Sequence, residues 1–314
     1  MAGFDERDTV FSRMELREGT PRYEAYYAAH PSRKAADDAA RAAKGPYAGD
    51  EPRRRIVDAT FGLLEQMRPL ARGEPSGERM DISPDTARTE LEALAKGYGA
   101  VMFGTAVLGE ACFYGIRGRG EEYGREATVI GRTGVVFAVR MAPAEIAAAP
   151  EPRAAAEVVN GYARVALVGL VLARCIRGWG WNASCTMDGR ADVVLPVAAR
   201  YAGLGSIGRS GILLTEEFGP CLRLGAVVTD LPLARTPRSA GTEARLCSTC
   251  SLCAKACPAG AIDGGTASSG RFKPVNDDAC FAKWKEFGTD CGLCIASCPL
   301  SRVGRVSGSG VVGP

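Results

Sequence analysis

The alternation of apolar and polar positions changes character along the chain, and these changes predict where helices and strands lie. Residues 22–45 and 53–73 are rich in alanine and charge, with apolar residues at helical spacing, so each predicts a partly solvated helix. Residues 83–100 begin at a Ser-Pro pair and end at glycine, which are common start and stop signals of a helix. The predicted buried face of the second helix carries Ile56, Phe61, Leu64 and Met67.

From Tyr98 onward short apolar runs bounded by glycine predict strands, over residues 99–109, 127–131, 134–142 and 221–233. A long helix is predicted from residue 151 to Gly178. Its apolar positions at helical spacing are Val158, Tyr162, Val165, Gly169, Leu172 and Ile176. This order describes an α/β (α+β) protein. We expect a helical unit of residues 1–90, an α/β core of residues 91–233 and a cysteine-rich domain of residues 234–314.

The stretch "AGLGSIGRSG" contains Gly203-x-Gly205-x-x-Gly208, the spacing of a dinucleotide-binding loop. Such a loop needs a strand before it and a helix after it. Here Pro196 suits the first turn of a preceding helix, Gly203 suits its C-terminal cap, and "SGILL" predicts a short strand afterwards. Because this order is the reverse of a dinucleotide site, the sequence argues against NAD, and the glycines need another role.

Composition and charge narrow the function classes. The 314 residues carry 39 basic and 36 acidic side chains, and the net charge of +3 gives no sign of a nucleic-acid or anionic-membrane partner. No apolar run reaches the roughly 18 residues of a membrane span. The N-terminal stretch is too charged for a secretory signal and lacks a twin-arginine pair, so we expect a cytoplasmic protein unless a leader has been removed. The single histidine, His30, is expected in a loop before a helix and excludes any multi-histidine metal site.

Twelve cysteines are present, and eight of them lie in the last quarter of the chain. The first run reads C-x2-C-x2-C-x3-C-P, which is the bacterial iron–sulfur signature, and the second reads C-x2-C-x3-C-P with one more cysteine upstream. Disulfides fit poorly in a chain without a secretory signal, and zinc sites use paired C-x2-C knuckles. The two runs therefore predict two [4Fe–4S] clusters. The predicted ligands are Cys247, Cys250, Cys253, Cys257, Cys280, Cys291, Cys294 and Cys298.

In two-cluster proteins the cysteine before proline binds the other cluster. We therefore expect each cluster to draw on both runs. The first set is Cys247, Cys250, Cys253 and Cys298, and the second set is Cys257, Cys280, Cys291 and Cys294. Crossing of this kind holds the clusters close together and makes a short path for electrons, which then needs an acceptor in the preceding 230 or so residues.

The glycine loop and the cysteine runs together resemble the corrinoid iron–sulfur reductases, which comprise the reductive dehalogenases and, more distantly, epoxyqueuosine reductase. The segments that carry this resemblance are "FDERDTVFSR", "GYARVALVGLVLARCIRGWGWNA", "AGLGSIGRSGILLTEEFGPCLRLGAVVTDLPL", "CSTCSLCAKACPAGAI" and "CFAKWKEFGTDCGLCIASCP". They span nearly the whole chain, and the glycine block with "CFAKWKEFG" favours the dehalogenase branch.

The resemblance implies a nitroreductase-like core that binds a corrinoid, joined to a ferredoxin-like domain with two [4Fe–4S] clusters. It implies cobalamin bound base-off, with no protein histidine on cobalt, and reduction of a small organohalide by cob(I)alamin. It makes Tyr162 the proton donor beside Arg209, because a cation favours the phenolate left behind. The residues implied to contact the cofactor are Asn182, Asp188, Gly203, Gly205, Ser206 and Gly208, with the glycines allowing close approach of backbone to the macrocycle.

Two other functions fit the same residues. One is an epoxyqueuosine-type reductase acting on tRNA, in which Asp188 falls within one position of the branch's proton-donor aspartate. The other is a non-catalytic protein that transfers electrons or handles corrinoid, because the segment before Tyr162 is short where dehalogenases wall the substrate pocket. For the reductase we expect an external electron donor, either a ferredoxin or a flavodoxin.

Overall fold

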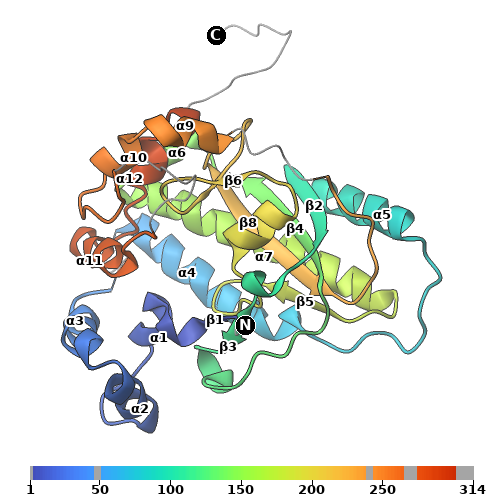
Figure 1. Cartoon of the computed structure of the whole chain (residues 1–314), viewed down its shortest axis with the longest axis horizontal. Coiled ribbons are helices and arrows are strands. Elements are labelled where there is room, and N and C mark those ends of the chain that lie inside the picture. Colours follow the sequence, from blue (N-terminus) through green and yellow to red (C-terminus); the bar gives the residue numbers. More distant parts are fainter. Residues whose placement is uncertain (1–2, 46–50, 238–242, 265–273, 302–314) are drawn as a thin grey trace, which may run out of the picture.

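A computed structural model describes residues 3–45, 51–237, 243–264 and 274–301, and its centre is a four-stranded sheet (Figure 1). The strands are β2 (Met102–Val107), β4 (Thr133–Arg140), β8 (Leu222–Thr229) and β5 (Ala183–Thr186), in the order β2-β4-β8-β5. Every neighbouring pair is antiparallel. The strands alternate side chains between two buried faces, so the sheet has a hydrophobic layer on each side.

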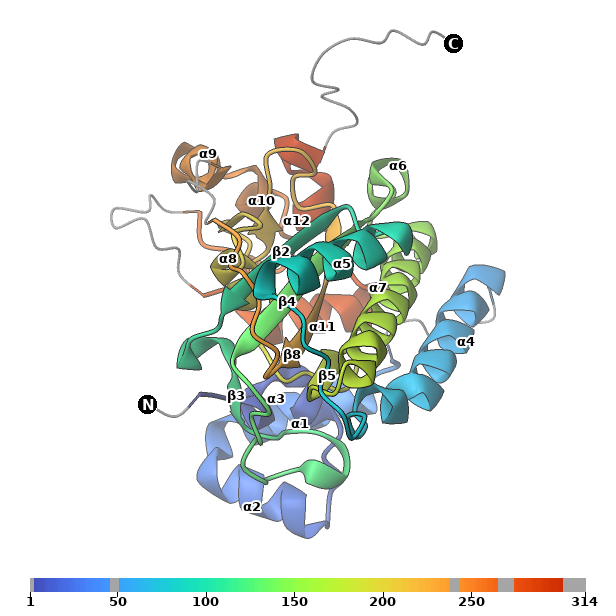
Figure 2. The same ribbon diagram turned by 90° about the vertical axis from the view of Figure 1, so that its right-hand side faces the viewer.

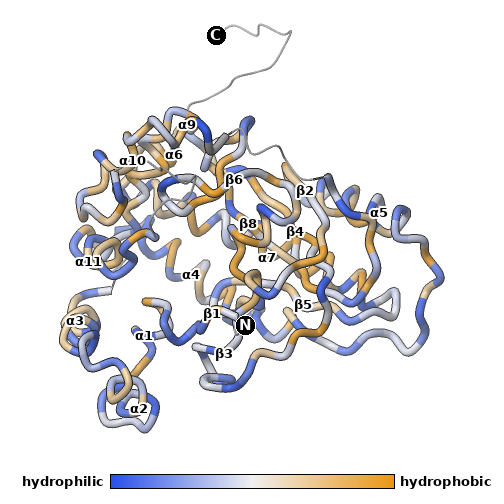
Figure 3. The backbone as a smooth tube through the Cα atoms, viewed as in Figure 1, coloured by the Kyte–Doolittle hydropathy of each residue, from blue (hydrophilic) through white to orange (hydrophobic). Residues whose placement is uncertain are grey.

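Helix α7 (Pro152–Gly178) covers one face of the sheet, with α4 (Pro52–Met67) and α5 (Pro84–Gly97) packed beside it (Figure 2). The contact is close because Gly169 has no side chain: a Cβ there would lie 2.4 Å from the Cys185 sulfur. The shorter helix α8 (Leu195–Tyr201) covers the other face. Figure 3 shows hydrophobic residues concentrated on the strands and α7, whereas α2 and α3 are mostly hydrophilic.

In the described part of the chain, α7 is the one helix that is long and apolar enough to span a membrane. Of its most apolar stretch, 56% is buried inside the fold. Val158, Val165, Leu172 and Ile176 all lie in hydrophobic clusters, as the periodicity predicts. Packing against the sheet therefore accounts for the apolar composition of this helix.

The N-terminal arm lies beside the cysteine-rich helices at the other end of the chain (Figure 1). The Arg13 guanidinium is 1% exposed and pairs with Asp37 at 2.9 Å and with Asp278. The Phe11 ring packs edge-on against Phe281, with centroids 5.8 Å apart. These contacts tie the two ends of the chain together. The arm consists of β1 (Phe4–Asp5), η1 (Glu6–Asp8), α1 (Val10–Met14), α2 (Pro21–Ala29) and α3 (Pro31–Ala42).

Short elements complete the fold. The cysteine-rich region contains α9 (Glu243–Thr249), α10 (Leu252–Lys255), α11 (Asp277–Phe287), α12 (Leu293–Ala296) and η5 (Pro299–Ser301). The connecting elements are η2 (Arg68–Ala71), η3 (Glu110–Cys112), β3 (Tyr114–Ile116), η4 (Gly120–Glu122), α6 (Pro143–Ile146), β6 (Ser206–Ile207) and β7 (Leu213–Leu214). Strand β1 pairs with β3 in parallel, and β6 pairs with β7 as an antiparallel hairpin.

Three predictions about the elements need correction. Residues 127–131 form no strand, because the ladder beside β3 is limited to the Ile116–Glu126 bridge and the Ala127 hydrogen bond to Gly115. Ile56 is 56% exposed, and the buried residue of that turn is Val57. The helical segment 22–45 is divided into α2 and α3 at His30, because Pro31 begins a new helix. His30 therefore precedes a helix, as predicted.

The packing also crosses the boundary predicted at residue 90. Leu64 and Leu91 are fully buried and belong to the same hydrophobic cluster as Leu172 of α7. Helices α4 and α5 are thus part of the core layer, and the separate N-terminal arm ends with α3. The sequence missed this because both kinds of helix are rich in alanine and charge, and only the contacts distinguish them.

Candidate functional site

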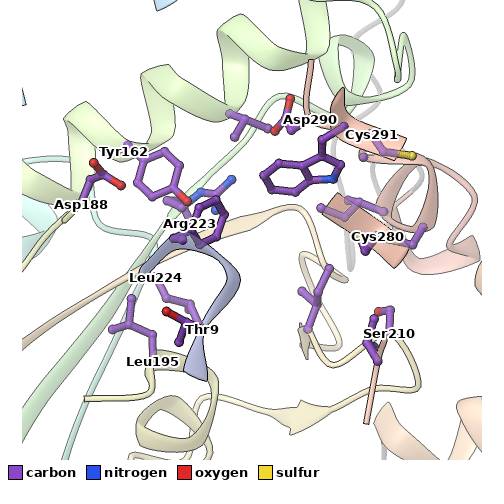
Figure 4. A pocket seen from close by; sticks show the side chains of 18 of the residues that line it. Thr9, Tyr162, Asp188, Leu195, Ser210, Arg223, Leu224, Cys280, Asp290 and Cys291 are labelled. Atoms are coloured by element: carbon purple, nitrogen blue, oxygen red, sulfur yellow. The ribbon is translucent and has the colours of Figure 1, made fainter. Parts of the chain in front are cut away.

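A cavity of about 610 Å³ lies between the sheet, the N-terminal arm and the cysteine-rich helices (Figure 4). Helix α7 contributes Val158, Tyr162 and Val165 to its wall, and β8 contributes Arg223 and Leu224. The opposite wall comes from the cysteine-rich region. The residues there include Cys257, Cys280, Trp284, Cys291 and Cys294. The cavity thus joins segments that are far apart in the sequence, and its size is in the range of small-molecule sites.

The eight predicted ligand cysteines separate into two groups of four. Cys247, Cys250, Cys253 and Cys298 line a small cavity of about 20 Å³, which Cys294 also touches. Cys257, Cys280, Cys291 and Cys294 line the large cavity. Each group therefore draws cysteines from both runs, because the short helices α10 and α12 pack against each other. These are the two sets that the crossed arrangement predicts.

Most electrostatic neighbours of these thiols belong to the same set, and Cys294 is in addition influenced by Cys253 of the first set. Burial raises the pKa of Cys298, and Cys247, Cys253 and Cys250 raise it further. Burial likewise raises the pKa of Cys280 to about 11, with Cys291 and Cys257 adding to the shift. Buried thiols crowded in this way favour a positive partner that would hold them as thiolates. Among the described residues, no three His, Cys, Asp or Glu side chains are arranged to hold a single metal ion.

Tyr162 is half-buried on α7, and its ring lies directly against Arg223 (Figure 4). The guanidinium carbon of Arg223 is 4.3 Å from the centroid of the tyrosine ring, in a cation–π arrangement. The close approach depends on Gly161, where a Cβ would lie 3.2 Å from Cβ of Arg223. A tyrosine hydroxyl and a fixed positive charge therefore share one wall of the cavity.

Arg209 does not have the role predicted for it. Its guanidinium is buried and donates hydrogen bonds to the backbone oxygens of Cys250, Asp263 and Cys247, at 3.0, 2.9 and 2.7 Å. It lines the small cavity, where it holds the loop of the first set of cysteines. The cation beside Tyr162 is Arg223 instead. A signal for Arg223 was present in the sequence, because it is a charged residue inside the otherwise apolar run "CLRLGAVVT".

Of the predicted cofactor contacts, Asp188 alone lines the large cavity. One of its carboxylate oxygens lies 3.5 Å from Nη2 of Arg68. Asn182 points elsewhere: its backbone and side-chain nitrogens both donate to Asp230, at 2.8 Å. Gly203, Gly205, Ser206 and Gly208 are also outside the lining, and their loop reaches the cavity through Ser210 and Ile212.

The glycine loop has a structural reason in this fold. Gly203 has φ +77° and ends α8, and the following residues form the β6–β7 hairpin, so the order helix, loop, strand is confirmed. A Cβ at Gly205 would lie 2.2 Å from the backbone oxygen of Leu214. At Gly208 it would meet the Leu214 side chain at 2.6 Å and the Cys247 sulfur at 3.4 Å. The glycines therefore let the hairpin close on itself beside the first set of cysteines.

We expect Gly205→Ala to lower the free energy of unfolding by about 1–3 kcal/mol, because the new methyl group would press on backbone and not on a movable side chain. Gly62→Ala is the matched control: a Cβ at this position within α4 meets nothing within 4 Å. That change should stabilise by about 0.5–1 kcal/mol, since alanine loses less backbone entropy. Anaerobic urea unfolding measures both, and equal effects of the two substitutions would contradict this role for Gly205.

A network of charges holds the segment that carries Asp188. Burial would raise the pKa of Asp192, but Arg117, Ser184 and Arg72 outweigh that effect and hold the pKa below its usual value. Arg72 donates to this carboxylate at 2.8 Å. Beside it Arg190, which lines the cavity, pairs with Glu122 at 3.1 Å. Several charged contacts therefore hold the cavity-lining segment that contains Asp188 and Arg190 in place.

Several buried polar atoms at the cavity have no hydrogen-bond partner: Oγ1 of Thr186 and the Nε atoms of Arg190 and Arg223. Such atoms are costly unless a bound molecule satisfies them. No histidine is among the lining residues. His30 is stacked on Tyr26, with ring centroids 4.4 Å apart, and its Nδ1 lies 3.0 Å from the Tyr26 carbonyl oxygen. The lining therefore fits a polar-edged ligand without a protein histidine on a metal.

Solved structures show that this fold is known. The chain superposes on a reductive dehalogenase, described with a mechanism for B12-dependent dehalogenation, with a TM-score of 0.70 and 21% identity over 86% of this chain and 42% of that one. A catabolic reductive dehalogenase in complex with 3-bromo-4-hydroxybenzoic acid gives 0.68 and 22% identity over 78% and 37%. Structural similarity at 21–22% sequence identity shows that these proteins share a fold.

Sequence comparison shows to which known proteins the chain is related. No protein-family model matches the chain. It is 32% identical to the tetrachloroethene reductive dehalogenase of Sulfurospirillum multivorans over 178 residues, which are 54% of this chain and 35% of that protein. It is 30% identical to the epoxyqueuosine reductase of Listeria monocytogenes over 117 residues, 33% of this chain and 28% of that one. The chain is thus related to the reductive dehalogenases and, with shorter matches, to the epoxyqueuosine reductases, and the matched region is about a third of these relatives.

Proposed function

We propose that this chain is a corrinoid-dependent iron–sulfur reductase that removes halide from a small organohalide. One observation carries the proposal: the second set of cysteines and the Tyr162–Arg223 pair line the same cavity. An electron source and a proton donor would therefore serve one bound substrate. The paired helices α10 and α12 support a ferredoxin-like domain, and the sheet with α7 and α8 supports a nitroreductase-like core.

The overall reaction takes two electrons and one proton, breaks the carbon–halogen bond, and yields a carbon–hydrogen bond and a halide ion. The corrinoid, when bound, supplies the reduced cobalt centre at which the halogen is removed. This chain's own residues do the rest. The two cysteine sets hold clusters that deliver electrons one at a time, and the Tyr162 hydroxyl gives the proton to carbon. The charge of Arg223 stabilises the phenolate that remains and attracts the departing halide.

The residues expected to hold the cofactor follow from the cavity lining. Leu195, Ile212 and Leu224 offer an apolar floor, and the unpartnered Oγ1 of Thr186 offers a hydrogen bond to a polar edge of the ring. Asp188 and Arg190 also line the cavity and would offer hydrogen bonds to the side-chain amides of a corrin. With no histidine in the lining, we propose binding in the base-off form.

The decisive experiment is reconstitution under anaerobic conditions with iron, sulfide and cobalamin. We expect about eight irons and one cobalt per chain, and release of halide from tetrachloroethene or 3-bromo-4-hydroxybenzoate with a titanium(III) reductant. The first compound is the one for which the related dehalogenase of Sulfurospirillum multivorans is named, and the second is bound in a solved structure of similar fold. Protein that binds eight irons and no cobalt would contradict the proposal and would indicate an electron-transfer protein.

A second candidate, reduction of an epoxide in tRNA, is favoured by one residue. Asp188 lies on the cavity wall near Tyr162 (Figure 4) and could act as the proton donor in its place. Asp188→Asn and Tyr162→Phe distinguish the two functions. Loss of activity on an epoxyqueuosine-containing stem-loop in the first variant would support the tRNA reaction, whereas loss of halide release in the second supports dehalogenation.

A further inference from the structure

We propose that the outer face of α9 and α10 is the docking surface for an acidic one-electron carrier protein, of ferredoxin or flavodoxin chemistry. This inference rests on the proposed function, because it concerns the point where electrons enter. The docking patch is defined as Arg245 and Leu246 of α9 together with Leu252 and Lys255 of α10. All four side chains are exposed.

The position of the patch follows from the order of the two cysteine sets. The second set borders the large cavity, so electrons leave the protein's clusters there. The first set lines the small cavity, whose wall includes the exposed Leu246 of α9, and none of its cysteines lines the large cavity. Figures 1 and 2 both place α9 at the periphery of the molecule. The first set is therefore the entrance, and a carrier must approach it from this side.

Leu246 connects the surface with the cluster site. The Leu246 side chain lines the small cavity and is 44% exposed. A molecule bound against Leu246 is therefore separated from the first set of cysteines by this side chain. Leu252 is 47% exposed and lies beside Cys253 in sequence. Two exposed leucines over a redox site give the small apolar centre that transient electron-transfer complexes use.

The charges around the leucines select the carrier. Arg245 precedes Leu246 on α9, and Lys255 lies one helical turn after Leu252 on α10. The guanidinium of Arg209 adds a positive charge nearby, bonded to the carbonyls of Cys247 and Cys250. Exposed carboxylates occur on the neighbouring β7–β8 turn, at Glu216 and Glu217. A carrier with carboxylates around its redox centre is thus attracted to the patch and oriented away from that turn.

A second group of exposed apolar residues, on α4 and η2, lacks this connection. Ile56, Leu63 and Leu70 form a stripe along α4 and η2 with exposed fractions of 56%, 52% and 56%. None of them lines either cysteine cavity. This stripe provides a matched control, because a charge introduced there alters the surface equally without approaching a cluster.

The test is stopped-flow reduction of the cluster-loaded protein, without corrinoid or organohalide, by a reduced acidic [2Fe–2S] ferredoxin and by flavodoxin hydroquinone. We expect the double variant Arg245→Glu/Lys255→Glu to lower the second-order rate constant at low salt by about tenfold or more. The difference should shrink as salt screens the charges. Dithionite, which needs no docking, should reduce this variant at the wild-type rate.

Three variants complete the design. Arg245→Lys/Lys255→Arg keeps the charge and should keep the rate, Leu252→Glu should slow the carriers, and Leu63→Glu on α4 should not. The proposal is overturned when the charge-reversed and Leu252 variants accept electrons from both carriers at the wild-type rate, or when Leu63→Glu slows them equally. Because the measurement omits corrinoid and substrate, its outcome is independent of whether dehalogenation is found.

Discussion

Tyr162→Phe is expected to reduce halide release by about 10²- to 10⁴-fold, the contribution typical of a positioned proton donor. The substitution removes only the hydroxyl, and the ring keeps its contacts with Arg223 at 4.3 Å and with Phe61 at 6.0 Å. The fold, the iron content and the bound cobalt should therefore be unchanged. Turnover in the reconstituted enzyme, with iron and cobalt counted in the same sample, measures this.

Two further variants show whether the loss comes from chemistry. Tyr98→Phe is the matched control, because Tyr98 is a 48% exposed tyrosine at the end of α5 that lies outside the cavity. Arg223→Lys should keep part of the activity and Arg223→Gln should lose most of it, since the proposed role needs a positive charge beside the phenolate. Full turnover in Tyr162→Phe would remove this tyrosine from the mechanism and leave Asp188 as the proton donor to examine.

The second large effect concerns how the cysteines are shared between clusters. Cys257 comes from the first run and yet lies with Cys280, Cys291 and Cys294, so Cys257→Ala should damage the cluster beside the large cavity. Cys298→Ala should damage the cluster of the first set, at the small cavity, in the same way. The expected loss is up to about four irons in each case, or conversion to a cluster with fewer irons.

The assignment can be checked with Cys250 and Cys291 as references. Cys250 belongs to the first set and Cys291 to the second, whether or not the two runs exchange their last cysteine. The electron paramagnetic resonance spectrum of Cys257→Ala should match that of Cys291→Ala, and the spectrum of Cys298→Ala should match that of Cys250→Ala. A double variant of Cys257 and Cys291 should keep one cluster, whereas a double variant of Cys257 and Cys250 should lose both. The reverse pattern would show that each run holds its own cluster.

Much of the chemistry could be recognised from local sequence. A ligand run such as C-x2-C-x2-C-x3-C-P places several thiols within a few residues, so its spacing indicates the kind of site, although the fourth cysteine of each run lies with the other run. The long helix over residues 151–178 was equally predictable, because its apolar positions recur at helical spacing over many turns. The order helix, loop, strand around Gly203 also followed from local signals.

The errors occurred where a residue's role depends on distant partners. Arg209 and Arg223 are both arginines near the glycine block, and although Arg223 interrupts an apolar run, the sequence does not show which of the two faces Tyr162. The choice is made by β8, which places Arg223 against α7, and by the loop of Cys247, whose carbonyls occupy Arg209. Likewise Asn182 faces Asp230 and not the cavity, which only the pairing of β5 with β8 decides.

By itself the sequence determined the long core helix, the order of elements around Gly203 and the family relationship, because each depends on residues close together in the chain or on segments read in order. Only the tertiary structure decided which wall each side chain joins, which arginine faces Tyr162, and which cysteine set borders the cavity. The physical reason is that the cavity is enclosed by the N-terminal arm, the sheet and the C-terminal helices, and the positions of such remote segments are set by packing and not by local pattern.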